Sequence, residues 1–108
     1  MTSELAGALR ERVAIERRLP DRDRWAGARG GWAYDGAAWV SVTPVVAGDE
    51  GSADPRAARA RWRVVMRKRE GIGGTSRFVW RGRFLSVRSI LSDPRDPSHM
   101  IVTCEEAR

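Results

Sequence analysis

The sequence predicts an all-β fold, a small β-barrel of about six strands with a long loop between the second and third strands and a short N-terminal helical turn. The clearest evidence is the run RARWRVVMRKR at residues 59–69, where Trp62, Val64 and Met66 take every second position. Arginines fill the opposite parity, with Val65 as the one apolar exception. Because successive side chains of a strand point to opposite faces, this run predicts a strand with a buried face and an arginine face.

The second observation is a hairpin pattern in residues 77–91, RFVWRGRFLSVRSIL. Two β-rich pieces flank a polar corner that contains a glycine, as is typical of a hairpin. We expect its aromatic residues Phe78, Trp80 and Phe84, and Trp62 before them, to pack in the core. A barrel that stacks nucleotide bases would instead interleave aromatic and basic residues on one exposed face.

Length and composition predict one globular domain over residues 1–108. A chain of 108 residues buries roughly two-thirds of the surface that it exposes when unfolded. Its hydrophobic content of 42% and charged content of 31% suit a folded domain. No apolar run approaches the roughly 18 residues of a membrane span, and the N-terminus lacks the apolar core of a signal peptide. We therefore expect no membrane partner and a protein that stays in the cell that made it.

The charge is strongly positive and almost entirely arginine. The formal net charge is +6, and Lys68 is the single lysine among twenty basic residues. Arginine forks onto carboxylates and phosphates, so contact with nucleic acid or with an acidic protein surface is one interpretation. The other is a genome rich in G and C, which raises Arg, Ala and Gly together. The single cysteine, Cys104, fits a reducing compartment.

The pattern of residues 3–46 predicts a short helical turn and then two strands joined by a loop. Residues 3–9 have the pattern of a short helical turn that must dock on something, and a strand follows from about residue 12 to 18. The loop at 20–31 contains Trp25, which we expect to cover the core edge. Residues 32–34 begin the returning strand, and Asp35-Gly36 predicts a turn that breaks it. The second clear strand is AWVSVTPVV at 38–46, in which pairing should weaken near Pro44.

Residues 47–60, AGDEGSADPRAARA, differ from the rest because they lack apolar alternation. Asp54-Pro55 before RAARA has the pattern of a capped helix start. We treat 45–60 as a loop excursion between the second and third strands. Long loops in small domains are usually functional or mobile, and the alternative is an insertion without a role.

The residues on either side of the hairpin predict two turns, and the end of the chain predicts one last strand. The glycines of residues 70–74 fit neither a P-loop nor a dinucleotide fingerprint, so they predict a flexible turn. Residues 92–97 form a turn with two prolines. A final strand runs from His99 to Glu106, with Met100, Val102 and Cys104 on one face.

No catalytic constellation emerges, so we predict no enzyme, no cofactor and no metal. His99 and Cys104 have opposite parity in one strand, which argues against a zinc site and against a cysteine–histidine nucleophile. Adjacent Glu105 and Glu106 fall on opposite sides of that strand and do not form an acid–base pair. A hydrolase would need a site that the sequence does not contain.

Several pieces appear in an order that carries a resemblance. They are LRERVAIERR near the start, a Trp-containing strand that runs into Pro44 and then Gly48-Asp49-Glu50, an arginine-rich strand, and a hairpin with Gly82-Arg83. The chain resembles the phage head–tail joining family, also called head-closure or stopper proteins, over about residues 9–106. Trp25 and the helix start at 55–61 depart from that pattern.

The resemblance implies a structural protein of the neck of a tailed phage or a phage-like gene transfer agent. Family members resemble small β-barrels that form a ring, with six copies preferred and twelve possible. The ring joins the portal-bound adaptor of the filled head to the tail terminator and tail-tube proteins. It retains packaged double-stranded DNA, which passes through its channel without sequence recognition. The implied location is therefore the virion neck, after assembly in the bacterial cytoplasm.

The 45–60 loop is implied to reach the channel or a neighbouring subunit. Its candidate oligomer- or channel-facing residues are Asp49, Glu50, Asp54, Arg56, Arg59 and Arg61. Arginines here would meet either DNA phosphates, blind to sequence, or acidic residues of a neighbour. We favour the neighbour slightly, since a conduit that bound DNA tightly would impede ejection. The alternative function is a basic nucleic-acid-binding barrel in the host cytoplasm.

Overall fold

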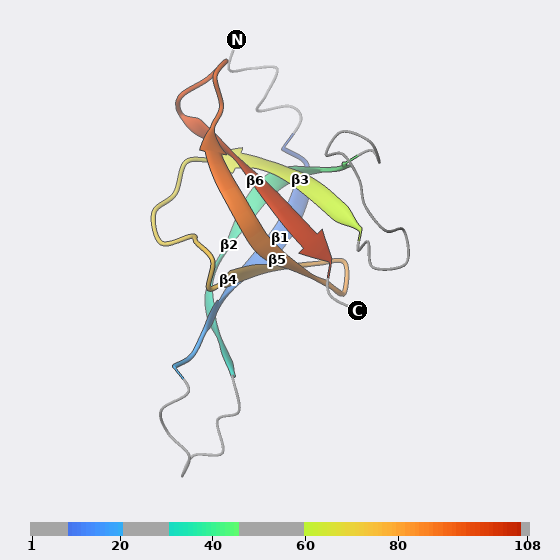
Figure 1. Cartoon of the computed structure of the whole chain (residues 1–108), viewed down its shortest axis with the longest axis vertical. Coiled ribbons are helices and arrows are strands. Elements are labelled where there is room, and N and C mark those ends of the chain that lie inside the picture. The colour runs from blue at the N-terminus through green and yellow to red at the C-terminus, as the bar shows by residue number, and fades with distance from the viewer. Residues whose placement is uncertain (1–8, 21–30, 46–59, 107–108) are drawn as a thin grey trace.

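Six antiparallel strands form a closed barrel in the computed structural model (Figure 1). The structure describes residues 9–20, 31–45 and 60–106. Around the barrel the strand order is β1-β2-β3-β6-β5-β4. The strands are β1 (Glu11–Arg18), β2 (Trp32–Pro44), β3 (Arg61–Arg67), β4 (Ser76–Trp80), β5 (Arg83–Ser92) and β6 (His99–Glu106).

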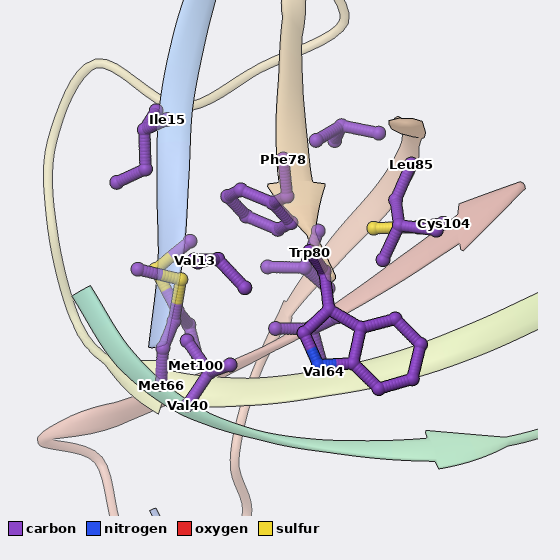
Figure 2. Close-up of a cluster of buried hydrophobic side chains, with 12 residues drawn as sticks. Val13, Ile15, Val40, Val64, Met66, Phe78, Trp80, Leu85, Met100 and Cys104 are labelled. Atoms are coloured by element: carbon purple, nitrogen blue, oxygen red, sulfur yellow. The ribbon is translucent and has the colours of Figure 1, made fainter. Parts of the chain in front are cut away.

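Alternation along each strand builds the core. In β3, Val64 and Met66 are buried while Arg61, Arg63 and Arg67 are exposed, as the sequence predicts. The inward side chains of all six strands meet in one apolar cluster, most of which is labelled in Figure 2. Its members are Val13, Ile15, Val40, Val64, Met66, Phe78, Trp80, Leu85, Val87, Met100, Val102 and Cys104.

Two ladders continue beyond the shared barrel. The β1–β2 ladder runs on to the pair Arg18–Trp32, past the start of β4 at Ser76. The β5–β6 ladder runs on to Ser92–Met100, whereas β4 pairs with β5 only up to Ser86. In Figure 1 these two hairpin arms leave the barrel on opposite sides.

The predicted strand set is confirmed, with changes at strand ends. The last strand has the predicted bounds, and β3 is shorter at each end than the predicted 59–69. The hairpin around Arg81-Gly82 joins β4 to β5. The predicted N-terminal helical turn, Trp25 and the loop from 46 to 59 lie outside the described residues.

The predicted turn at Asp35-Gly36 is wrong, because β2 passes through it unbroken. Ala14 pairs with Ala37 and Glu16 with Tyr34, so Asp35 and Gly36 together oppose the single residue between Ala14 and Glu16. This is a β-bulge. Within it Gly36 adopts a positive φ of 116°, a backbone conformation that glycine tolerates far better than other residues do. A tight turn and a β-bulge can both place glycine at a positive φ. The local sequence Asp35-Gly36 therefore does not distinguish one from the other.

Arg69, which follows β3 in the chain, donates hydrogen bonds to backbone carbonyls at this bulge. The sequence places it on the outer arginine face of β3, but it lies beyond the strand and is half-buried. Its Nη2 donates to the carbonyl of Asp35 at 2.6 Å and its Nη1 to the carbonyl of Ala37 at 3.3 Å. A Cβ on Gly36 would lie in the space of the Arg69 guanidinium.

Phe84 is the one predicted core aromatic that the structure places outside. It is 40% exposed, because the inward positions of β5 are Leu85 and Val87. The Arg77 guanidinium lies 4.1 Å from the ring centroids of both Phe84 and Trp32, so the two outer rings enclose a cation. Such cation–π contacts stabilise exposed sites by about 0.5–1 kcal/mol each.

Substitution of Gly36 tests the bulge. Gly36→Ala should lower the free energy of unfolding by about 1–3 kcal/mol, because alanine disfavours this φ and its methyl group meets Arg69. Gly73→Ala is the matched control: its methyl group would meet no atom within 4 Å, so we expect a change below about 0.5 kcal/mol. Urea denaturation of both variants measures the difference. Equal stability of the two would contradict the role assigned to the bulge.

Candidate assembly surface

The two feet of the 46–59 connection lie side by side at one end of the barrel. The amide of Val45 donates to the carbonyl of Arg61 at 3.0 Å, and the amide of Glu106 donates to the carbonyl of Ala60 at 2.8 Å. The connection therefore leaves and re-enters the barrel at one place, next to the end of β6.

A pair of tryptophans closes the same end. Trp62 from β3 and Trp80 from β4 meet edge to face, with ring centroids 5.0 Å apart and an interplanar angle of 62°. Trp62 Nε1 donates to Glu106 Oε1 and Trp80 Nε1 donates to Glu11 Oε1, each at 2.9 Å. Each indole thus buries its rings while its N–H finds a carboxylate at the rim.

The β4–β5 turn adds two arginines to this rim. Arg81 Nη2 lies 2.8 Å from Glu11 Oε2, and Arg83 Nε lies 3.7 Å from Glu106 Oε2. The Arg83 guanidinium also lies 5.4 Å from the centroid of Trp80. Exposed pairs contribute little one by one, but here two indoles, two carboxylates and two guanidiniums fix each other. We call these six residues, Glu11, Trp62, Trp80, Arg81, Arg83 and Glu106, the tryptophan rim.

Arg81 holds an uncommon backbone conformation to reach this position. Its φ is 50° and that of Gly82 is 78°. Positive φ at both central residues is the geometry of a tight hairpin turn, where Asn-Gly is the usual choice. The contacts of Arg81 with Glu11 and with the Trp80 ring, 5.3 Å away, accompany this strained position.

Arg61 is the one predicted site residue within the described chain. It is exposed at the foot of the connection, and its Nε lies 3.7 Å from Glu105 Oε2. Arg88 Nη2 contacts the other oxygen of Glu105 at 2.6 Å, so one carboxylate serves two arginines. The other predicted site residues, Asp49, Glu50, Asp54, Arg56 and Arg59, lie outside the described residues.

The histidine and the cysteine occupy different surroundings. His99 is the buried first residue of β6, and its Nδ1 lies 3.0 Å from Oδ2 of Asp96 in the preceding turn. Hydrogen bonds from the hydroxyl and the amide of Ser98 lower the pKa of Asp96, with a smaller contribution from His99. Cys104 is a fully buried core residue, and burial raises the pKa of its thiol to about 12.

Neither a metal cluster nor a membrane helix is found in the described chain. No three histidine, cysteine, aspartate or glutamate side chains within residues 9–20, 31–45 and 60–106 come together as ligands for a metal ion. In the same ranges no helix has the length and apolar character needed to cross a membrane.

The family model of the phage head completion protein matches residues 5–107, almost the whole chain. The chain belongs to the phage head completion protein family. Membership makes it a structural protein of a phage or phage-like particle, and it confirms the resemblance derived from the sequence. No curated protein matches the sequence.

Among the solved structures that share this fold are two that cover almost the whole chain. A chain in the virion of a native gene transfer agent superposes with a TM-score of 0.69 at 19% identity, covering 92% of this chain and 96% of that one. The solution structure of protein SF1141 from Shigella flexneri 2a gives a TM-score of 0.66 at 24% identity, covering 93% and 94%. At such identities the likeness concerns the fold.

The geometry of the tryptophan rim predicts that Trp62 contributes more to the stability of the fold than the exposed Trp39 does. Trp62→Phe removes the indole N–H that Glu106 accepts, so we expect the free energy of unfolding to fall by about 1–2 kcal/mol. Trp39→Phe is the matched control, since Trp39 is 53% exposed, and its cost should stay below about 0.5 kcal/mol. Thermal and urea unfolding measure both. A larger loss from Trp39→Phe would refute this ranking.

Burial of Cys104 predicts an unreactive thiol. With its pKa raised to about 12, the thiol stays neutral at pH 8, and no path leads a reagent to it in the folded barrel. We expect an aromatic disulfide reagent to label native protein at least about a hundredfold more slowly than protein in concentrated urea. Labelling of native protein at the rate of a free thiol would show that the barrel opens.

Proposed function

We propose that this head completion protein forms a ring at the neck of its particle and joins the DNA-filled head to the tail. The observation that carries the proposal is the placement of the 46–59 connection, whose feet are fastened together beside the tryptophan rim. A long connection with a rigid base suits an arm that reaches a neighbouring subunit. Family membership and the fold shared with a gene transfer agent chain support the same role.

The composition of the connection favours contact between subunits over tight DNA binding. It contains Asp49, Glu50 and Asp54 as well as Arg56 and Arg59, so copies in a ring can pair opposite charges. DNA that moves through the ring would meet the arginines through its phosphates, without sequence recognition. We propose six copies and a non-enzymatic role, with an adaptor on the head side and tail proteins on the other.

Deletion of residues 47–58 in the producing strain tests this function. We expect a monomer that still folds, because the deleted stretch lies between the fixed feet at Val45 and Ala60. Particles should lose DNA or fail to take tails. A Gly-Ser segment of equal length in place of 47–58 is the control for length, and it should fail in the same way if the charges matter.

Electron microscopy and the fraction of nuclease-protected DNA give the readout. Normal yields of tailed, filled particles from the deletion would refute the proposed role of the connection. Salt-sensitive binding of nucleic acid by the purified wild-type monomer, with normal assembly of the deletion, would favour a nucleic-acid-binding barrel instead.

A further inference from the structure

A hollow opens where the pairing between β2 and β3 stops. The ladder ends at the pair Val40–Met66, while β2 continues on its other edge along β1. The β2–β3 ladder does not continue beyond Met66, but the Arg69 guanidinium spans the gap and donates to the carbonyls of Asp35 and Ala37. The hollow that remains has a volume of about 890 Å³. That size suits two or three side chains of a bound segment.

The floor of this hollow is apolar. Leu9, Ala37, Ala38 and Met66 line it, and the exposed ring of Trp39 forms one wall. An exposed tryptophan beside an apolar concavity is a typical anchor point in protein interfaces. Trp39 is not needed for the core, since its side chain points away from the buried Val40.

Among the described residues, the charged groups that line the hollow are all cations: Arg67, Lys68 and Arg69. A fourth, Arg12, lies with its guanidinium 5.2 Å from the centroid of the Trp39 ring. Within the described residues neither Arg67 nor Lys68 has a carboxylate partner, and both are exposed. By contrast, the carboxylates of the tryptophan rim and of Glu105 already have arginine partners.

We propose that this hollow is a docking site for an acidic peptide segment of a protein partner, one that carries an apolar anchor between its carboxylates. The anchor packs on Trp39 and the apolar floor, and the carboxylates meet Arg67 and Lys68. Charge complementarity selects this occupant, because an apolar segment without acids would leave the cations that line the hollow unmatched. The proposal stands apart from the role of the 46–59 connection, whose flanking residues Val45 and Ala60 lie at the other end of the β2–β3 ladder.

Duplex DNA fits the hollow less well. Its phosphates lie on a convex, hydrated surface and need exposed cations on a face that can follow the groove. Here the floor is apolar and concave, and Arg69 is half-buried with two of its N–H groups already bonded to carbonyls of β2. A peptide side chain can enter such a hollow, whereas a double helix cannot.

NMR titration of the isotope-labelled full chain tests the proposal. The probe is the capped peptide DELFDE, and its uncharged counterpart NQLFNQ is the matched peptide. We expect DELFDE to shift the signals of Ala37, Ala38 and the Trp39 indole, and NQLFNQ to bind at least about tenfold more weakly. The variant Arg67→Gln/Lys68→Gln should weaken DELFDE binding by about tenfold as well.

A second double variant, Arg63→Gln/Arg95→Gln, removes two exposed cations that do not line the hollow. It lowers the net charge by the same amount, so binding within about twofold of the wild type separates a site from general attraction. Equal binding of both peptides, equal loss in both variants, or shifts away from Trp39 would overturn the proposal. So would a duplex oligonucleotide that shifts the same signals more strongly, or binding that appears only after residues 1–8 are removed.

Discussion

Closure of the barrel through β1 is the constraint on which the rest of the structure depends. β1 pairs with β2 on one edge and with β4 on the other, and its inward Val13 and Ile15 are fully buried. In a closed sheet the strand edges in the shared region are used up, so partners must meet the ends, the outer face or the seams where a ladder stops. The tryptophan rim and the hollow beside Trp39 are places of these kinds, and both exist because strands of unequal length were joined into one ring of hydrogen bonds.

Arginine serves the fold itself at the points where the backbone is least regular. Arg69 satisfies two carbonyls beside the bulge at Gly36, and Arg81 contacts Glu11 from a residue with positive φ. Arg77 lies between two outer rings and also contacts Glu16 Oε1 at 2.7 Å. A planar group with several donors can meet carbonyl, carboxylate and aromatic face at once, which lysine cannot. A good part of the arginine excess is therefore structural.

The sequence is most informative where side-chain alternation decides the outcome. It predicts β3, the β4–β5 hairpin and β6, because their inward residues are apolar at every second position. The prediction is wrong at Asp35-Gly36, because a turn and a bulge can both place glycine at a positive φ. Only the pairing with β1 decides between the two. The prediction that Phe84 packs in the core is wrong because the next residue, Leu85, is also apolar. Leu85 and Val87 take the inward-facing positions of β5 instead. The hollow depends on where a ladder between distant strands ends, which no local pattern encodes.

The distribution of charge separates two uses of the remaining arginines. At the tryptophan rim, cations and carboxylates lie next to each other and neutralise each other, so the charges of that end are internally matched. The backbone hydrogen bonds of Val45 and Ala60 lie at the same end. Around Trp39 the cations lie next to an apolar floor without a described carboxylate among them. A mutational bias toward arginine would raise its number everywhere, but it would not by itself pair Arg81 and Arg83 with carboxylates while Arg67 and Lys68 have none among the described residues. The unmatched cations beside a concave apolar surface are what a partner with the opposite pattern would complete.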